Sequence, residues 1–217
     1  MRRIDLSELA AEERWICAPL TLSTAEILGR LFIFEPVLKA PRTLSTNRLT
    51  FSVPTLDDIE AIFYRYAGDL AVTKYLGWPC HRSVADTTEF VLFSQNQWQI
   101  SPAGPYLIWS QSTGQLLGST GLSCEKLNQA LTGYVLAKDA WGNGFATEAL
   151  NAMVQVAQQL SLARIIALCH PDHRASRRVL EKTGFTIDPS WSFKLEFPNL
   201  ARGILQEVNC YELVFRK

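Results

Sequence analysis

Two glycines one residue apart, Gly142 and Gly144, follow an apolar run and precede a strongly patterned helix. Glycine permits positive φ angles and lets a ligand approach the backbone closely. The helix expected behind the loop would direct its free N–H groups and the positive end of its dipole toward it. The stretch WGNGFATEAL, residues 141–150, therefore predicts a site for a phosphate-bearing ligand.

The elements that position this loop follow from hydrophobic periodicity. An apolar run over 132–137 predicts a strand that enters the loop. Small or apolar side chains at helical spacing from Ala146 to Leu160 predict a helix behind it, with one stripe buried against a sheet. The other predicted strands cover 48–53, 106–111, 116–122, 165–168, 185–187 and 206–215, and the other predicted helices follow Thr55, Ser83 and His173. This order predicts an α/β sheet with antiparallel and parallel pairs.

Composition limits the classes of function. The chain has 217 residues, of which 21 are basic and 21 acidic, and this balance argues against nucleic acid or an anionic membrane as the main partner. Five scattered cysteines without a C-x-x-C pair indicate reduced thiols, not a disulfide frame or zinc site. Acidic residues interrupt the N-terminal apolar stretch and no run of eighteen apolar residues follows, so we expect a cytoplasmic protein.

The first 43 residues differ from the rest of the chain. Two apolar stretches, over 6–10 and 25–34, are followed by Pro36 and Pro41, which break the pattern. We expect an N-terminal extension over 1–43 that either packs on the domain or binds a partner, and a single domain over 44–217.

Two motifs resemble those of the GNAT family of N-acetyltransferases. Residues 141–149 resemble its pyrophosphate loop, Gln/Arg-x-x-Gly-x-Gly/Ala, with Trp141 at the Gln/Arg position and Gly144 and Ala146 at the small positions. Residues 173–185, HRASRRVLEKTGF, resemble the family segment N-x-x-S-x-x-V-L-E-K-x-G-F. Both motifs come in the family's order, separated by one helix and one strand. Stretches upstream, such as STNRL and YLGWP, are similar to the RimJ/RimL branch that acts on ribosomal proteins, and the resemblance covers about residues 44–188.

The resemblance implies a GNAT fold and acetyl-CoA as co-substrate, with no metal. Backbone groups of Tyr134, Val135 and Leu136 would pair with the pantetheine arm, and one N–H there would face the thioester oxygen, a contact typically worth about 10²–10³ in rate. Ser176 would reach the sulfur, and His173 replaces a pantetheine-binding asparagine. The pyrophosphate would be held by the loop residues Trp141, Gly142, Asn143, Gly144, Phe145, Ala146 and Thr147.

The basic residues of the second motif are candidates for the 3′-phosphate of the cofactor. Arg174, Arg177 and Arg178 fall at i, i+3 and i+4 and so share one helix face. We expect Arg178 to contact this phosphate, and the alternative for each arginine is an ordinary solvated position.

The family's usual proton carriers are missing. Leu168 and Leu180 stand about where some members have a glutamate base and a tyrosine acid, and Leu131 replaces a glutamate on the preceding strand. Ser176 is then the candidate proton donor to the leaving thiolate, and Glu196 a candidate base, with a solvated carboxylate as its alternative. At pH 7 roughly one in ten α-amines is neutral, against roughly one in 10³ lysine amines. The missing carboxylates therefore favour an α-amine acceptor.

The implied function is transfer of an acetyl group to a primary amine by direct attack in a ternary complex. The acceptor, a protein N-terminus or a small molecule, stays open, as does the choice between monomer and homodimer. A GNAT-fold acyl-CoA sensor without turnover is the alternative from another class of protein.

Other chemistries fit the sequence less well. A Rossmann fingerprint would need a third glycine and an acidic residue on a following strand. A metal at His170, Asp172 and His173 would have three residues within one turn and no further ligands. Cys124 and Cys169 lack a flanking base for nucleophilic catalysis. Core or pocket-wall positions are the simplest interpretation of the large aromatics Phe90, Phe93, Trp98, Trp109 and Trp141.

Overall fold

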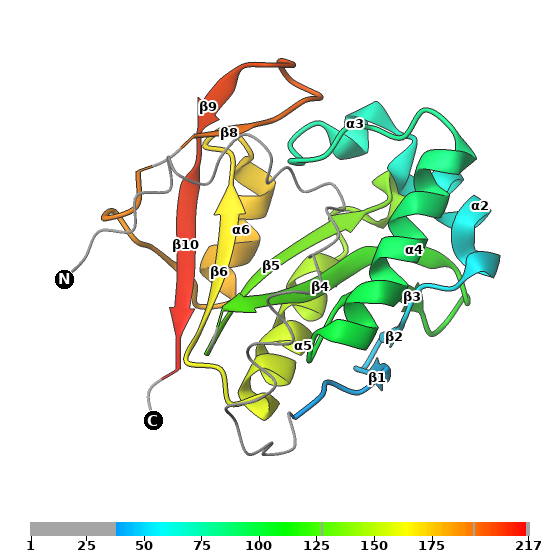
Figure 1. Ribbon diagram of the computed structural model, residues 1–217, viewed down its shortest axis with the longest axis horizontal. Coiled ribbons are helices and arrows are strands. Elements are labelled where there is room, and N and C mark those ends of the chain that lie inside the picture. Colours follow the sequence, from blue (N-terminus) through cyan, green and yellow to red (C-terminus); the bar gives the residue numbers. More distant parts are fainter. Residues whose placement is uncertain (1–37, 127, 193, 216–217) are drawn as a thin grey trace, which may run out of the picture. The chain divides into compact units, whose positions relative to one another are not determined.

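The computed structural model describes residues 38–126, 128–192 and 194–215 (Figure 1). The apolar stretches predicted within residues 1–34 lie outside this part of the chain. The boundary between residues 43 and 44 stays a prediction. In the described chain, Ala40 already contacts the domain, because its N–H bonds to the carbonyl of Pro102 at 2.7 Å.

A mixed sheet forms the centre of the described chain. It has eight strands in the order β1-β2-β3-β4-β5-β6-β10-β7. Its strands are β1 (Thr43–Ser45), β2 (Leu49–Ser52), β3 (Pro105–Ser110), β4 (Leu116–Lys126), β5 (Gln129–Leu136), β6 (Arg164–Cys169), β7 (Thr186–Ile187) and β10 (Asn209–Val214). All neighbours pair antiparallel except β5 and β6, which are parallel. The predicted mixed α/β sheet is confirmed.

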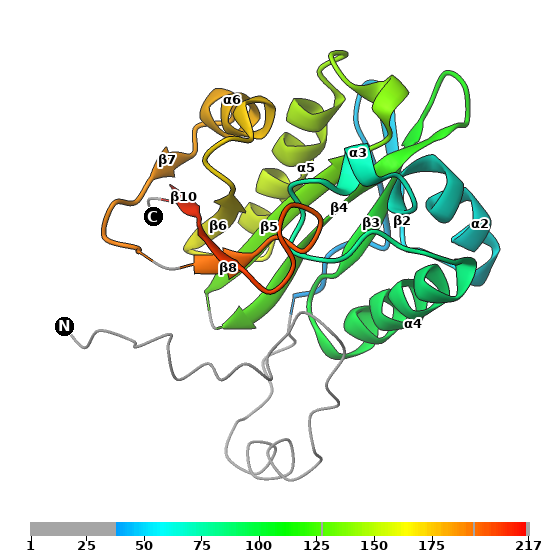
Figure 2. The same ribbon diagram turned by 90° about the horizontal axis from the view of Figure 1, so that it is seen from above.

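Helices cover both faces of this sheet, and Figure 2 shows α5 on one side and α4 on the other. The helical segments are η2 (Leu56–Asp58), α2 (Ile59–Ile62), η3 (Phe63–Ala67), α3 (Leu70–Thr73), α4 (Val84–Ile100), η4 (Lys138–Ala140), α5 (Phe145–Gln159) and α6 (Arg174–Lys182). Alternate residues of β3 serve the two cores: Ile108 packs in the cluster with α5, and Leu107 in the cluster with η3. None of the helices in the described chain is long and apolar enough to cross a membrane.

The predicted helix starts are confirmed at both caps. The N–H of Thr55 donates to Asp58 at 2.8 Å, and the N–H of Ser83 donates to Asp86 at 3.3 Å. The helix after Thr55 is less regular than expected. The N–H of Gly68 bonds to the carbonyl of Phe63 five residues earlier, at 2.9 Å, so this segment ends in a π-type turn.

One predicted strand is divided in the structure. The pattern over 206–215 predicts a single strand, yet β10 pairs with β6 while β9 (Leu205–Glu207) pairs with β8 (Lys194–Glu196) in a separate two-stranded sheet. Periodicity reports which face a residue occupies, and it cannot report a change of partner strand along one extended segment.

Candidate functional site

The site is built where two parallel strands separate. The pairing of β5 with β6 runs from Gln129↔Arg164 to Thr132↔Ala167 and then ends, although both strands continue. Beyond this point the β6-facing edge of β5 has no strand partner in the described chain. The result is an open edge of backbone groups in the middle of the sheet, next to the turn that leads to the glycine loop.

Alternation along β5 decides which backbone groups face this split. The N–H of Ala137 donates to the carbonyl of Leu117 at 2.7 Å, so residues in phase with Ala137 direct their polar groups toward β4. Val135 is one of them, and its carbonyl would lie 2.0 Å from a Cβ added at Gly118. Tyr134 and Leu136 are out of phase and direct theirs into the split. Of the three residues predicted to pair with pantetheine, these two have the required direction.

The glycine loop presents free amides beside the split. Gly142 and Gly144 have φ angles of 77° and 78°, in the region that only glycine adopts readily. Gly144 caps α5, and none of the N–H groups from Gly142 to Thr147 donates a hydrogen bond within the described chain. The backbone over 142–144 is exposed. Free amides at the positive end of a helix suit an anion, so the predicted phosphate site stays a prediction with the required geometry.

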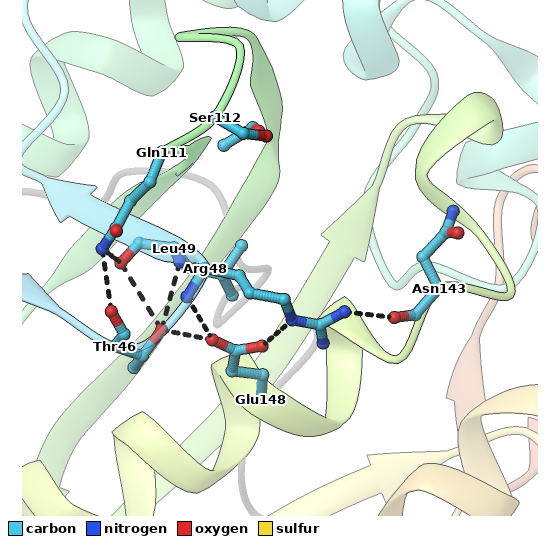
Figure 3. A network of polar contacts seen from close by, with 8 residues as sticks. Thr46, Arg48, Leu49, Gln111, Ser112, Asn143 and Glu148 are labelled. Carbon is cyan, nitrogen blue, oxygen red and sulfur yellow. Dashed lines mark hydrogen bonds and ion pairs between the residues drawn. The ribbon is translucent and has the colours of Figure 1, made fainter.

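A polar network, shown in Figure 3, fixes the loop to the turn between β1 and β2. Glu148, in the first turn of α5, accepts hydrogen bonds from Thr46 Oγ1 at 2.6 Å and from Arg48 N at 2.9 Å and Nε at 2.7 Å. Arg48 Nη1 then donates to the carbonyl of Asn143 at 2.9 Å. This clamp engages the Asn143 carbonyl, while the loop amides donate no hydrogen bond within the described chain.

The clamp also determines the charge state of its carboxylate. Burial alone would raise the pKa of Glu148, but the hydrogen bonds from Thr46 and Arg48 outweigh it and hold that pKa below its ordinary value. Glu148 therefore stays ionised, and Arg48 offsets its charge next to an anion site. The Arg48 guanidinium also lies 4.7 Å from the ring centroid of Phe145.

Trp141 links the loop to the end of β5. Its indole Nε1 donates to the carbonyl of Leu136 at 2.8 Å, and 46% of the side chain remains exposed. Tryptophan keeps a donor where the family motif has glutamine or arginine. Because this contact occupies the Leu136 carbonyl, Tyr134 and the Leu136 N–H are left to face the split.

Ser176 lies across the split from Tyr134. The Ser176 and Tyr134 hydroxyls are 2.9 Å apart, and the Tyr134 hydroxyl is 3.2 Å from the Ser176 carbonyl. Burial raises the pKa of Tyr134, against the opposing effect of the Ser176 hydrogen bond, so the phenol stays protonated. Burial likewise raises the pKa of the Cys169 thiol. Ser176 and Tyr134 therefore offer hydroxyl protons at the split, and Cys169 offers no thiolate.

The three arginines of α6 do not share one environment. Arg177 directs its Nε to the hydroxyl of Tyr211 on β10 at 3.3 Å and its Nη1 to the Pro171 carbonyl at 3.3 Å. Arg174 and Arg178 are exposed. The predicted contact with the 3′-phosphate therefore remains open for Arg174 and Arg178, and Arg177 has a structural use.

Two rings stack at the beginning of α6. The ring of His173 stacks on Tyr75 with centroids 4.7 Å apart and planes 21° apart. His170 lies 5.1 Å from the same tyrosine and packs edge-to-face on Phe197 at 4.8 Å. No group of three or more His, Cys, Asp or Glu side chains in the described chain could hold a metal. This ring cluster joins the end of β6 to two segments, residues 73–80 and 197–206, which frame the other side of the split.

Asn199 ties those two segments together. Its Nδ2 donates to the carbonyls of Thr73 at 2.8 Å and Trp78 at 2.9 Å, and its Oδ1 accepts from the N–H of Cys80 at 2.8 Å. Glu196, the candidate base, lies on β8 and accepts from the N–H of Gly203 at 2.9 Å. Its carboxylate thus supports the loop between β8 and β9.

Comparison with known proteins identifies the family. A model of the acetyltransferase (GNAT) domain matches residues 48–186, more than half of the chain. The chain belongs to the GNAT acetyltransferase family. It is also 32% identical over 145 residues to the uncharacterized N-acetyltransferase YoaA of Bacillus subtilis, which covers 65% of this chain and 81% of the relative.

Solved structures show the same GNAT fold. The microcin C7 self-immunity acetyltransferase MccE, solved with acetyl-CoA and AMP, has a TM-score of 0.71 and 21% identity, covering 83% of this chain and 100% of that one. The acetyltransferase of Salmonella typhimurium that modifies the N-terminal serine of ribosomal protein L7/L12 has a TM-score of 0.66 and 21% identity, covering 79% and 97%. The predicted family, fold class and enzyme class are confirmed.

Sequence reasoning did not identify several residues of this GNAT site. The Tyr134 hydroxyl, the clamp of Arg48 and Glu148, and the Asn199 bridge were not predicted. Glu148 belongs to the motif but its partners lie about a hundred residues earlier, so no local pattern could reveal the pairing.

Proposed function

We propose that this GNAT enzyme transfers the acetyl group of acetyl-CoA to a primary amine by direct attack within a ternary complex. The observation that carries the proposal is the split between β5 and β6 beside the amides of the glycine loop. Backbone groups of Tyr134 and Leu136 suit the pantetheine arm, the loop amides suit the pyrophosphate, and exposed Arg178 suits the 3′-phosphate.

Ser176 is proposed as the proton donor to the leaving thiolate. Its hydroxyl is hydrogen-bonded to Tyr134, whose phenol stays protonated, so a proton given up by Ser176 can be replaced. The amine nitrogen forms a bond to the thioester carbonyl carbon, the carbon–sulfur bond breaks, and the departing sulfur takes this proton. The amine nitrogen gives up one proton, through water or a protein group, and this proton makes good the one that the hydroxyls supplied.

We propose an α-amine, such as a protein or peptide N-terminus, as the acceptor. Within the described residues, no carboxylate lies at the positions of the family's usual base, and a neutral α-amine is roughly a hundredfold more abundant at pH 7 than a neutral lysine amine. The Salmonella neighbour that modifies an N-terminal serine supports this choice, although its likeness is one of fold.

The test compares two versions of one peptide. One has a free N-terminus and an acetylated lysine, and the other has an acetylated N-terminus and a free lysine. With acetyl-CoA and the protein, we expect coenzyme A thiol release with the first peptide, and far less with the second, measured with a thiol reagent. Spermine and free amino acids complete the panel.

Two results would overturn the proposed acetyl transfer, and a third would overturn the proposed acceptor. Tight acetyl-CoA binding in calorimetry without thiol release for any amine would favour an acyl-CoA sensor. No binding of acetyl-CoA would exclude both functions. Release with spermine or lysine alone would keep the enzyme and change the acceptor.

A further inference from the structure

His173 occupies the junction between the two sides of the split. It precedes α6, one turn before Ser176, and its ring stacks on Tyr75 from the segment that follows α3. The side chain is half-buried, and neither ring nitrogen has a hydrogen-bond partner among the described residues. A half-buried imidazole with both nitrogens available, next to a proton donor, has the geometry of an acid–base group.

The charged and titratable groups around this ring are few. His170 lies at the end of β6, Cys169 precedes it, and Lys74 Nζ is 5.1 Å from the Tyr75 centroid. Asp172 and Arg174 adjoin His173 in the chain and are exposed. Within the described residues, none of these groups forms an ion pair with the His173 ring, so the environment supplies burial more than charge.

Two hydrogen bonds fix the ring of His170. Its Nδ1 accepts the N–H of Asp172 at 3.1 Å, and its Nε2 lies 3.1 Å from Gln206 Oε1. Burial lowers the pKa of His173, and the neighbouring His170 lowers it further. His173 is therefore neutral at pH 7 and able to accept a proton.

The other groups near the split are less favourably arranged for this task. Leu168 and Leu180 carry no proton, and the Ser176 hydroxyl is engaged with Tyr134. Glu196 holds the N–H of Gly203 in the loop between β8 and β9. His173 alone among these residues combines a free basic atom with a position at the junction.

We propose that His173 is the general base that accepts the proton of the attacking amine. The proposal rests on the proposed function. As the nitrogen–carbon bond forms and the carbon–sulfur bond breaks, the amine proton passes to a ring nitrogen of His173, and the thiolate takes the Ser176 proton. Histidine thus stands where the family motif has asparagine, and Tyr75 is a positioning residue that orients the ring.

The decisive variant is H173N, because it restores the amide of the family motif. If His173 served only to bind pantetheine, H173N would keep full activity. As a base, its loss should lower kcat/KM for the α-amine peptide about 10²–10⁴-fold, while the KM for acetyl-CoA changes little. H173Q introduces the same amide on a longer side chain. A cooperative thermal unfolding transition of each variant checks that it folds.

The pH profile separates the base from the substrate amine. Below the pKa of the amine, log kcat/KM for the peptide should rise with a slope of one. Below the lowered pKa of His173 the slope in the wild-type protein should become two, since two groups must lose protons. H173N should keep a slope of one throughout. H81N, the same change at another half-buried histidine, should keep the slope of two.

An NMR titration requires no turnover, so it tests the protonation of His173 whichever amine is the acceptor. The chain has 3 histidines, so the NMR titration of His173 can be assigned by comparison with H173N. We expect its pKa below 6.5 in the acetyl-CoA complex. A pKa above 7, or an active H173N with an unchanged profile, would overturn the proposal. A wild-type protein that binds acetyl-CoA and acetylates no amine would instead contradict the proposed function.

Discussion

At the scale of single residues, the proposed proton donor is one of a pair of hydroxyls. Ser176 and Tyr134 meet at 2.9 Å across the split, and burial keeps the tyrosine protonated by raising its pKa. A buried hydroxyl next to a leaving thiolate can supply a proton without first being ionised. The phenol therefore adds no basic limb to the activity profile near neutral pH.

This arrangement predicts the effect of removing the serine hydroxyl. S176A should lower kcat about 10- to 100-fold, because the thiolate loses its donor, while the KM for acetyl-CoA stays near the wild-type value. Steady-state kinetics with the α-amine peptide measures both constants. Y134F, which keeps the backbone and ring, serves as the matched variant and should cause a smaller loss of kcat. An unchanged kcat in S176A would exclude the serine as the donor.

At the scale of elements, the glycine loop is positioned by residues outside its own segment. The turn between β1 and β2 supplies Thr46 and Arg48, and α5 supplies Glu148. A partly exposed ion pair contributes little to stability by itself. Its value lies in geometry, because Arg48 holds the Asn143 carbonyl and so fixes the backbone of the loop.

E148Q tests the clamp. Glutamine cannot accept all the hydrogen bonds of the carboxylate, so we expect the KM for acetyl-CoA to rise roughly fivefold, equivalent to about 1 kcal/mol, with kcat unchanged. The free energy of unfolding at pH 7 should fall by about 1–2 kcal/mol. Kinetics and urea denaturation check these two values.

The pH dependence of stability gives the same variant a second test. The folded-state pKa of Glu148 is lowered, so its stabilisation is present above the unfolded pKa and is lost as the pH falls through the folded pKa. The difference in unfolding free energy between the wild type and E148Q should therefore be largest near neutrality and vanish in acid. A constant difference from neutral pH to about pH 3 would contradict this assignment.

The limits of prediction also follow from these elements. The loop and α5 were predictable because glycine chemistry and helical periodicity act within a dozen residues. The end of pairing at Thr132 was not, since the continuation of β5 has the same apolar pattern whether or not β6 remains beside it. The clamp and the stack of Tyr75 on His173 join residues about a hundred positions apart, where no local rule applies.

At the scale of the whole domain, the described chain divides its work between two sides of the split. The loop of 142–147 with α5 and α6 forms the side that suits the acetyl donor. The segments over 73–80 and 197–206 form the other side, and the sequence did not assign them a role in the site. They are joined by Asn199 and by the rings of His170 and Phe197. Because the two sides share few polar contacts, substitutions should affect the two substrates separately.

N199A tests this separation. The change leaves the carbonyls of Thr73 and Trp78 and the N–H of Cys80 without their partner, so we expect a loss of about 2 kcal/mol in unfolding free energy. The KM for the amine should rise roughly tenfold while the KM for acetyl-CoA remains within about twofold, opposite to E148Q. N199D, which keeps the acceptor and replaces both donors with a charge facing two carbonyls, should be at least as damaging. The double variant E148Q N199A should show both effects added, because distant sites without shared partners act independently. A rise in the acetyl-CoA KM with N199A would show instead that the two sides are coupled through the split.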